Sequence, residues 1–162
     1  MISTVYTKKR IYRDCINSMK KEQVTQGLGM ASPTHTHQKL IGQIHKRYAE
    51  KFSNDQMLLG VAVVEEPERV PDISVWKHIG KGDDDSDPLM TIEITHTMQN
   101  DRYSEKSIIE TFLYVPTLEE AFIYNYTSEV WIRYRREKTG IVKENGKDYS
   151  RVMRLFLHTL LK

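Results

Sequence analysis

The chain has 162 residues, 39% of them hydrophobic and 28% charged, with a formal net charge of +2, which is typical of a folded globular domain and excludes a disordered chain. The single cysteine, Cys15, excludes an internal disulfide, and no Cys/His spacing suits a structural zinc site. The sequence also lacks a signal-peptide core near its start and any run of roughly 20 apolar residues. We therefore expect one cytoplasmic domain over residues 1–162 that makes no membrane contact.

Positive and negative charges are unevenly distributed along the chain. Residues 1–47 carry nine Lys and Arg against two Asp and Glu, whereas residues 65–101 carry three against ten. A basic flank beside an acidic patch suits a polyanion held over a bound cation. The alternative is that the N-terminal cations form only the solvated face of a helix. These cations are Lys8, Lys9, Arg10, Arg13, Lys20 and Lys21.

Two helices are expected in the first third of the chain. Helical spacing of apolar residues predicts a basic amphipathic helix from Lys8 to Val24. A second helix is expected to start near Ser32 or Thr34 and to end near Phe52. Its apolar stripe is formed by Leu40, Ile41, Ile44, Tyr48 and Phe52.

His37 lies on the inward side of the first turn of this second predicted helix, three residues before Leu40. A histidine in that place is more often a hydrogen-bonded core residue than a ligand or a catalytic base, so both interpretations stay open.

Three strands are expected to follow, over Met57–Glu65, Val70–Trp76 and Leu89–His96, because these runs are rich in β-branched and aromatic residues. The segment Gly80–Pro88 between the last two is expected to be a solvated loop. A calcium site is disfavoured there because the loop lacks the glycine and the terminal glutamate of an EF-hand.

Acidic side chains lie inside two of these strands. Alternation places Asp72 on the face opposite Ile73 and Val75. In the same way Glu93 and Thr95 lie opposite the apolar residues of their strand. Acids are unfavourable in strand interiors, which favours a functional role over a wet sheet face.

A third helix is expected from Asn100 to about Tyr114, with an apolar stripe of Ile109, Phe112 and Leu113. Lys106 precedes Ile109 by three residues and Leu113 by seven, so we expect its side chain to turn inward.

A hairpin is then expected between Ala121–Tyr126 and Val130–Arg136. Ile141–Glu144 and Tyr149–Leu157 could add edge strands around the turn at Asn145-Gly146, although the last segment could equally be helical. Helices, three strands, a helix and a hairpin predict an α/β (α+β) domain with a mixed sheet flanked by helices, without a glycine-rich phosphate loop.

Asp72, Glu93 and Lys106 together suit metal-assisted phosphodiester cleavage. Magnesium prefers oxygen ligands and keeps several waters, so the two carboxylates and the carbonyl of Ile94 would suffice. An ammonium from Lys106 would stabilise charge near the scissile phosphate. The alternative is that the acids are solvated and Lys106 extends its amine into water.

These residues resemble a known family. Pro71-Asp72 followed by Glu93-Ile94-Thr95 looks like the PD-(D/E)xK pattern, and the chain over residues 30–136 is similar to the Uma family of endonucleases. Further pieces that fit are Ser32-Pro33 with His37, Asp101 with Lys106, Val115-Pro116, and the hairpin from Glu120 to Tyr134. The basic segment 1–29 is an extension that the resemblance does not explain.

The resemblance implies a restriction-endonuclease-like core over residues 30–136, with Asp72 and Glu93 as ligands of Mg²⁺ or Mn²⁺. Thr95 stands where the pattern usually has lysine, and the resemblance implies that this role is shifted to the next helix, here to Lys106. His37 and Thr95 would support the ligands. Two departures are Asn125, where the family often has aspartate, and the long Gly80–Pro88 insertion.

Three hypotheses follow. The first is a Mg²⁺-dependent nuclease acting on DNA, as a homodimer if it cuts both strands. The second is a catalytically inactive protein of the same fold that binds nucleic acid or protein through its basic N-terminal helix. The third is a structural protein whose subunits pair through Tyr124, Tyr126, Trp131 and Tyr134. In the first, phosphate contacts are expected from Lys8, Lys9, Arg10, Arg13, Arg133 and Arg135.

Overall fold

The computed structural model describes residues 34–52, 57–59, 70–76 and 88–162. All the helices and strands described belong to one compact unit, His35–Lys162. The predicted basic helix with Lys8, Lys9, Arg10 and Arg13 lies outside the described residues, as does all of the Gly80–Pro88 loop except Pro88. None of the described helices is long and apolar enough to span a membrane.

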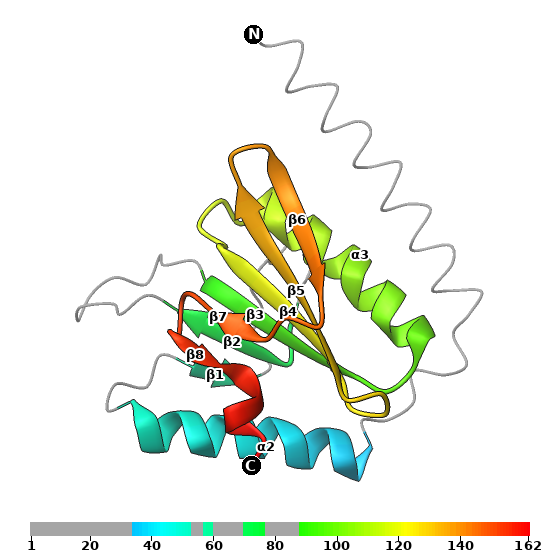
Figure 1. Cartoon of the computed structure of the whole chain (residues 1–162), viewed down its shortest axis with the longest axis vertical. Helices are drawn as coiled ribbons and strands as arrows, with labels where there is room; N and C mark the ends of the chain where they lie inside the picture. The colour runs from blue at the N-terminus through cyan, green and yellow to red at the C-terminus, as the bar shows by residue number, and fades with distance from the viewer. Residues whose placement is uncertain (1–33, 53–56, 60–69, 77–87) are drawn as a thin grey trace, which may run out of the picture. The chain divides into compact units, whose positions relative to one another are not determined.

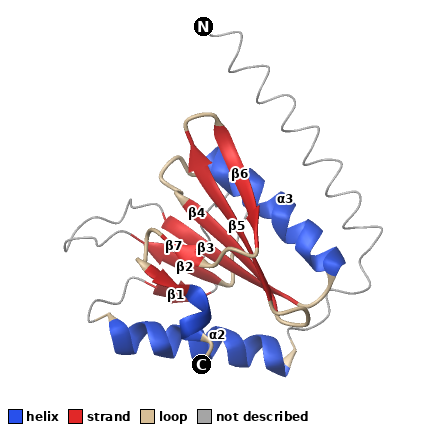
Figure 2. Ribbon diagram, viewed as in Figure 1, coloured by secondary structure: helices blue, strands red, loops and turns tan. Residues whose placement is uncertain are grey.

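A six-stranded mixed sheet forms the centre of this unit (Figures 1 and 2). β3 and β4 are parallel, and every other neighbouring pair is antiparallel. The predicted mixed sheet and the predicted hairpin are therefore confirmed. In spatial order the strands are β1 (Met57–Leu59), β2 (Ile73–Trp76), β3 (Pro88–Thr95), β4 (Glu120–Asn125), β5 (Val130–Glu137) and β6 (Gly140–Asn145).

Helix α3 (Met98–Tyr114) connects the two parallel strands, as parallel pairing requires a crossover. Thr97 is its N-cap, and the Thr97 hydroxyl accepts a hydrogen bond from the Asn100 amide at 3.1 Å. The helix therefore starts earlier than the predicted cap at Asn100. It ends at the residue before Val115, and Pro116 follows, which cannot continue a helix.

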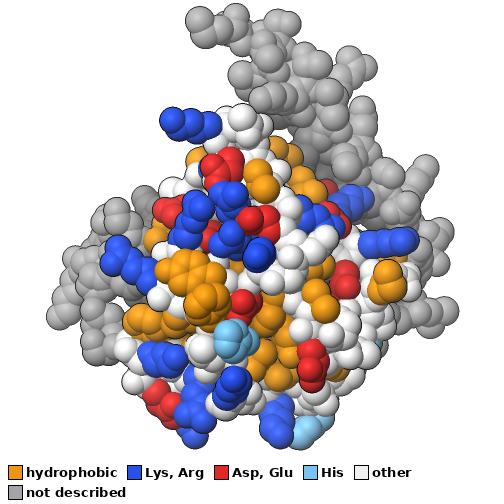
Figure 3. Space-filling model, viewed as in Figure 1, with side chains coloured by type: hydrophobic (Ala, Val, Ile, Leu, Met, Phe, Trp, Pro, Cys, Tyr) orange, Lys and Arg blue, Asp and Glu red, His pale blue; other side chains and the backbone are white. Residues whose placement is uncertain are grey.

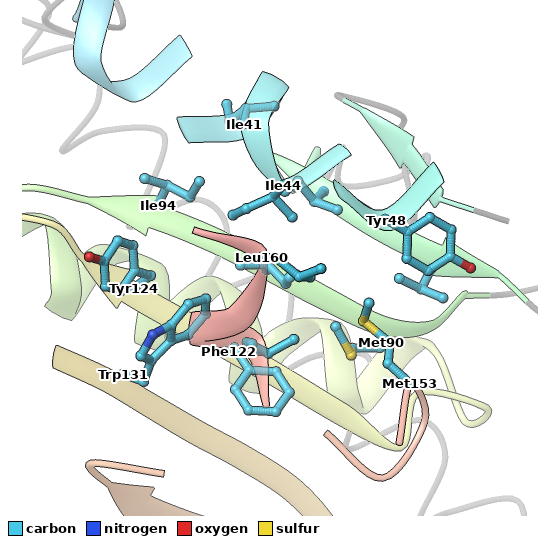
Figure 4. Packing of buried hydrophobic residues seen from close by; sticks show 14 residues of the cluster. Ile41, Ile44, Tyr48, Met90, Ile94, Phe122, Tyr124, Trp131, Met153 and Leu160 are labelled. Atoms are coloured by element: carbon cyan, nitrogen blue, oxygen red, sulfur yellow. The ribbon is translucent and has the colours of Figure 1, made fainter. Parts of the chain in front are cut away.

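Two hydrophobic cores lie on opposite faces of the sheet. Helix α2 (His35–Lys51) and the 3-10 helix η1 (Leu157–Leu160) pack on one face, and α3 packs on the other. Alternation along β4 sends Phe122 to the α2-side core and Ile123 to the α3-side core. Figure 4 shows how Ile44, Leu160 and Phe122 meet in the α2-side core.

The aromatic residues of the β4–β5 hairpin mostly belong to these cores. Tyr124, Trp131 and Tyr134 are 7%, 6% and 1% exposed, and Tyr126 is half-buried and stacks on His96. Because three of the four rings fill the interior, the core of the domain explains them, and the hypothesis that the hairpin pairs subunits stays a prediction. Their burial stabilises the domain itself.

The segment Ile141–Glu144 adds the edge strand β6 (Gly140–Asn145) to the main sheet, as predicted, but Tyr149–Leu157 does not join that sheet. β5 and β6 form a hairpin across a turn at residues 138–139, and Gly140, the first residue of β6, has a φ of 133° that favours glycine. After Gly146, β7 (Tyr149–Ser150) and β8 (Leu155–Phe156) form a separate two-stranded sheet. Figure 1 shows this small hairpin and η1 lying over the face of the main sheet that α2 also covers.

A buried carboxylate fixes this C-terminal hairpin to the sheet. Glu120 on β4 is 2% exposed and accepts hydrogen bonds from the Ser150 hydroxyl at 2.9 Å and from the amides of Arg151 and Val152 at 2.9 and 3.3 Å. Its other oxygen lies 4.0 Å from the guanidinium of Arg133. The buried charge is therefore compensated by hydrogen bonds from the segment that it holds.

A candidate active site at the carboxyl ends of β3 and β4

Asp72 lies immediately before β2, and its side chain binds a backbone amide of β3. Its Oδ2 accepts the Ile94 amide at 2.7 Å. Extending the pairing of Ile73 with Ile92 by two residues would place Pro71 opposite Ile94. Since proline has no N–H, Pro71 cannot donate to the Ile94 carbonyl, which faces the same strand edge as the Ile94 amide. The local sequence thus leaves a carboxylate and a carbonyl oxygen beside each other.

Glu93 lies on the face of the sheet that α3 covers, as its alternation with Ile92 and Ile94 predicts. Burial raises the pKa of Glu93 well above its usual value, and the negative charge of Asp72 raises it further. The two carboxyl groups are therefore close enough for ionisation of one to oppose ionisation of the other. A cation between them would remove that cost, which is the electrostatic pattern of a metal-binding pair.

Thr95 joins the ends of β3 and β4 to the start of α3. Its hydroxyl donates to Asp101 Oδ1 at 2.5 Å, and the Asn125 side-chain amide donates to Asp101 Oδ2 at 3.0 Å. Asp101 lies in the first turn of α3, where the helix dipole favours a negative charge. Thr95, which the resemblance matches to the lysine of the PD-(D/E)xK pattern, therefore has its hydroxyl bound to a carboxylate.

His37 reaches the same group of residues from the first turn of α2. Its Nε2 lies 3.1 Å from Asp72 Oδ2, and its side chain is 16% exposed. With the proton on Nε2, His37 donates to the carboxylate that also accepts the Ile94 amide. The predicted inward orientation of His37 is confirmed.

The predicted inward orientation of Lys106 is wrong. Ile109 and Leu113, the residues that suggested it, are themselves 39% and 71% exposed, and Lys106 is exposed with them. The buried side of α3 is instead marked by Ile108, which is 2% exposed. Lys106 is also five residues beyond Asp101, which at 3.6 residues per turn places it about 140° around the helix. The structure does not bring Lys106 to Thr95 and Asp101.

Arg133 and Arg135 are held by carboxylates rather than presented to solvent. Arg133 is 8% exposed, and its Nε donates to Glu144 at 2.8 Å, while Arg135 Nε donates to the same carboxylate at 2.9 Å. Arg135 also pairs with Glu137. Burial raises the pKa of Glu144, but hydrogen bonds and charge from both arginines outweigh it, so this pKa lies below its usual value. The phosphate contacts predicted for these arginines stay predictions, and they would require these ion pairs to open.

Within residues 34–52, 57–59, 70–76 and 88–162 no group of three or more His, Cys, Asp or Glu side chains is placed to hold a metal ion. A cation at Asp72 and Glu93 would therefore depend on the Ile94 carbonyl and on water for its other ligands. That donor set fits Mg²⁺, which keeps several waters, and does not fit a closed zinc site.

The hydrogen bonds that Asp101 accepts are the feature that the sequence alone missed. Asp101 was matched only as a companion of Lys106, and Asn125 only as a departure from the family pattern. The register of β3 with β4 places Thr95 directly beside Asn125, and both contact Asp101. A polar residue at the end of each of two parallel strands, followed by an acid in the first helical turn, is the signal that could have found this group.

These elements define an α+β domain with a mixed sheet, and the comparison with solved structures indicates the same fold. The chain is similar to the crystal structure of a putative nuclease belonging to DUF820 from Anabaena variabilis ATCC 29413, with a TM-score of 0.56 and 15% sequence identity. The match covers 79% of this chain and 81% of that chain. No family model matches this chain, and no curated protein does. The predicted fold class is therefore confirmed.

Proposed function

We propose that this chain is a metal-dependent nuclease that hydrolyses DNA phosphodiester bonds at Asp72 and Glu93. The observation that carries the proposal is the raised pKa of Glu93, which burial and the neighbouring Asp72 cause. A carboxylate pair that resists full ionisation is poised to gain a cation. The likeness of the fold to a putative nuclease supports the same assignment.

Mg²⁺ or Mn²⁺ is the proposed cofactor, held by Asp72, Glu93 and the carbonyl of Ile94. When bound, the ion would neutralise charge on the phosphate and lower the pKa of an attacking water. Glu93 must lose its proton to act as a ligand. Because its pKa is raised, protons compete with the ion, and metal affinity should increase as the pH rises through that pKa.

The other residues of the group keep the ligands in position. His37 binds the Asp72 carboxylate from α2, and the Ile94 amide binds the same oxygen, so Asp72 is held from two elements. Thr95 and Asp101 fix the end of β3 beside Glu93. We assign no step to Lys106, because its side chain is exposed on the far side of α3.

The test is cleavage of supercoiled plasmid DNA with Mg²⁺ or Mn²⁺ by the wild type and by Glu93→Gln and Asp72→Asn. Glu119→Gln is the matched control, since Glu119 is an exposed glutamate at the other end of the sheet. We expect cutting by the wild type and the control and loss of at least about a hundredfold in both site variants. Equal cutting by all four proteins would show that the activity comes from a contaminant. Linear product would further indicate that two copies act together.

A second candidate is a protein that keeps this fold and binds DNA without cutting it. The hydrogen bond from Thr95 to Asp101 and the exposure of Lys106 favour it, because no lysine takes the usual place beside the carboxylates in the part of the chain that the structure describes. DNA binding that survives Asp72→Asn with Glu93→Gln, together with no cleavage by the wild type at any Mg²⁺ or Mn²⁺ concentration, would establish this candidate.

A further inference from the structure

The β7–β8 hairpin presents aromatic side chains to solvent. Tyr149 and Phe156 are 39% and 52% exposed, and their rings lie 5.1 Å apart in an edge-to-face arrangement. The His158 ring is also exposed and lies 5.7 Å from that of Phe156. Large exposed aromatic residues that touch one another are uncommon on a surface that only meets water.

The hairpin holds these rings on a fixed base. Tyr149 pairs directly with Phe156 across the two strands, so both rings stay on one side of the hairpin. The next residue, Ser150, points the other way and is fully buried, with its hydroxyl bound to Glu120 at 2.9 Å and lying 3.2 Å from the sulfur of Met90. The inner side is therefore anchored in the domain, and the outer side carries an ordered pair of rings.

Positive charge surrounds these rings. Lys147, Arg151 and Arg154 lie in or beside the hairpin and are exposed. The acids nearby are already engaged: Asp148 accepts hydrogen bonds from both the ring and the amide of His158, and Glu137 pairs with Arg135 and lies 3.8 Å from Arg151. Figure 3 shows hydrophobic side chains exposed on the face that carries β7 and β8, with Lys and Arg side chains around them.

We propose that this surface, formed by Tyr149, Phe156, Lys147, Arg151 and Arg154, binds single-stranded nucleic acid. Exposed rings flanked by cations are the combination that single-stranded binding requires, since unpaired bases stack on the rings while phosphates meet the charges. The bases of a duplex already stack on one another and cannot reach these rings. The positive charge therefore favours binding of a polyanion, and the exposed rings favour a polyanion with unpaired bases.

The proposed surface is separate from the Asp72–Glu93 group. The hairpin packs near Met90, at the start of β3 and on the α2-side face, whereas Glu93 and Thr95 lie toward the end of that strand on the opposite face. The inference concerns binding and not cleavage. It can be tested without metal, so its failure and the failure of the proposed nuclease activity are distinguishable.

The experiment is fluorescence anisotropy of the full chain with a labelled 20-nucleotide oligo-dT strand and with a labelled 20-base-pair duplex, in EDTA. We expect tighter binding of the single strand, and Phe156→Ala should weaken that binding by about ten- to a hundredfold while changing duplex binding little. Phe156→Trp should restore it. The control is Leu113→Ala, a matched exposed apolar residue on α3, which should bind like the wild type.

Arg151→Gln with Arg154→Gln should weaken binding at low salt and reduce the slope of log affinity against log salt by about 1.4, close to 0.7 per lost phosphate contact. The proposal is overturned if the wild type does not bind the strand, or if Phe156→Ala binds it as the wild type does. It is also overturned if sedimentation shows that Phe156→Ala only converts a dimer to monomers, because the surface would then be a protein interface. Circular dichroism melts confirm that each variant is folded.

Discussion

Replacing Glu120 with alanine should destabilise the domain more than any other single change to a carboxylate described above. Three donors lose their acceptor: the Ser150 hydroxyl and the amides of Arg151 and Val152. An unsatisfied buried donor costs about 1–3 kcal/mol, and Arg151 is exposed and Val152 half-buried, so water can replace part of the lost bonding and we expect about 3–5 kcal/mol in total. For a chain of this length that corresponds to a fall in Tm of roughly 10 °C.

The assay is thermal and urea unfolding of Glu120→Ala, with Glu119→Ala as the control because Glu119 is the exposed neighbour on the same segment. The control should stay within about 0.5 kcal/mol of the wild type. Glu120→Gln should fall between the two, since it keeps one acceptor oxygen but loses the charge near Arg133. If Glu120→Ala has the same Tm and free energy of unfolding as the control, the carboxylate does not anchor the C-terminal hairpin.

Three further predictions concern single residues. Glu93→Gln should raise the free energy of unfolding in EDTA at neutral pH. The pKa of Glu93 is raised in the folded state, so the stability of the wild type falls as the pH rises from the ordinary glutamate pKa through the raised one, and glutamine removes this loss. Urea unfolding across pH 4–8 checks this, and a constant difference between the two proteins would contradict it. Lys106→Ala should change plasmid cleavage by less than about twofold and the free energy of unfolding by less than about 0.5 kcal/mol, because the Lys106 side chain is exposed. A hundredfold loss of cleavage would refute this exposed orientation. Glu129→Gly should stabilise the domain by about 1 kcal/mol, because Glu129 has a φ of 56° that glycine adopts without strain. A Tm at or below that of the wild type would show that the Glu129 side chain contributes more than the strain costs.

The sequence predicted the sheet well where strand alternation was clean. On β3 the alternation of Met90, Ile92 and Ile94 with Glu93 and Thr95 was assigned to the correct faces. The same argument failed on α3, because Ile108 and Ile109 are adjacent apolar residues and either could mark the buried stripe. Choosing Ile109 rotated the predicted inward face by one residue and turned Lys106 toward the protein. Only packing against Ile123 and Tyr134 decides between them.

Long-range contacts decide other features that the local sequence does not show. Arg133 and Arg135 look like exposed cations along β5, but the strand register brings Glu144 beside Arg133, and that pairing cannot be read from either segment alone. Likewise Tyr149–Leu157 has the composition of a strand. The place where this segment packs depends on Glu120, an acid about 30 residues earlier that binds the Ser150 hydroxyl.

The closure of the α2-side core by η1 has a consequence for how the protein is made. Gln43 on α2 donates to the carbonyl of Leu161, 118 residues later, and Leu160 fills the core beside Phe122 and Trp131. At about 5–20 residues per second, the ribosome finishes α2 several seconds before it finishes η1. β4 and β5 are synthesised late in that interval, and their apolar side lacks its η1 cover until η1 has been made. Helix α2 and η1 can therefore meet only once η1 has left the exit tunnel, and a chaperone that shields Phe122 and Trp131 would act before then.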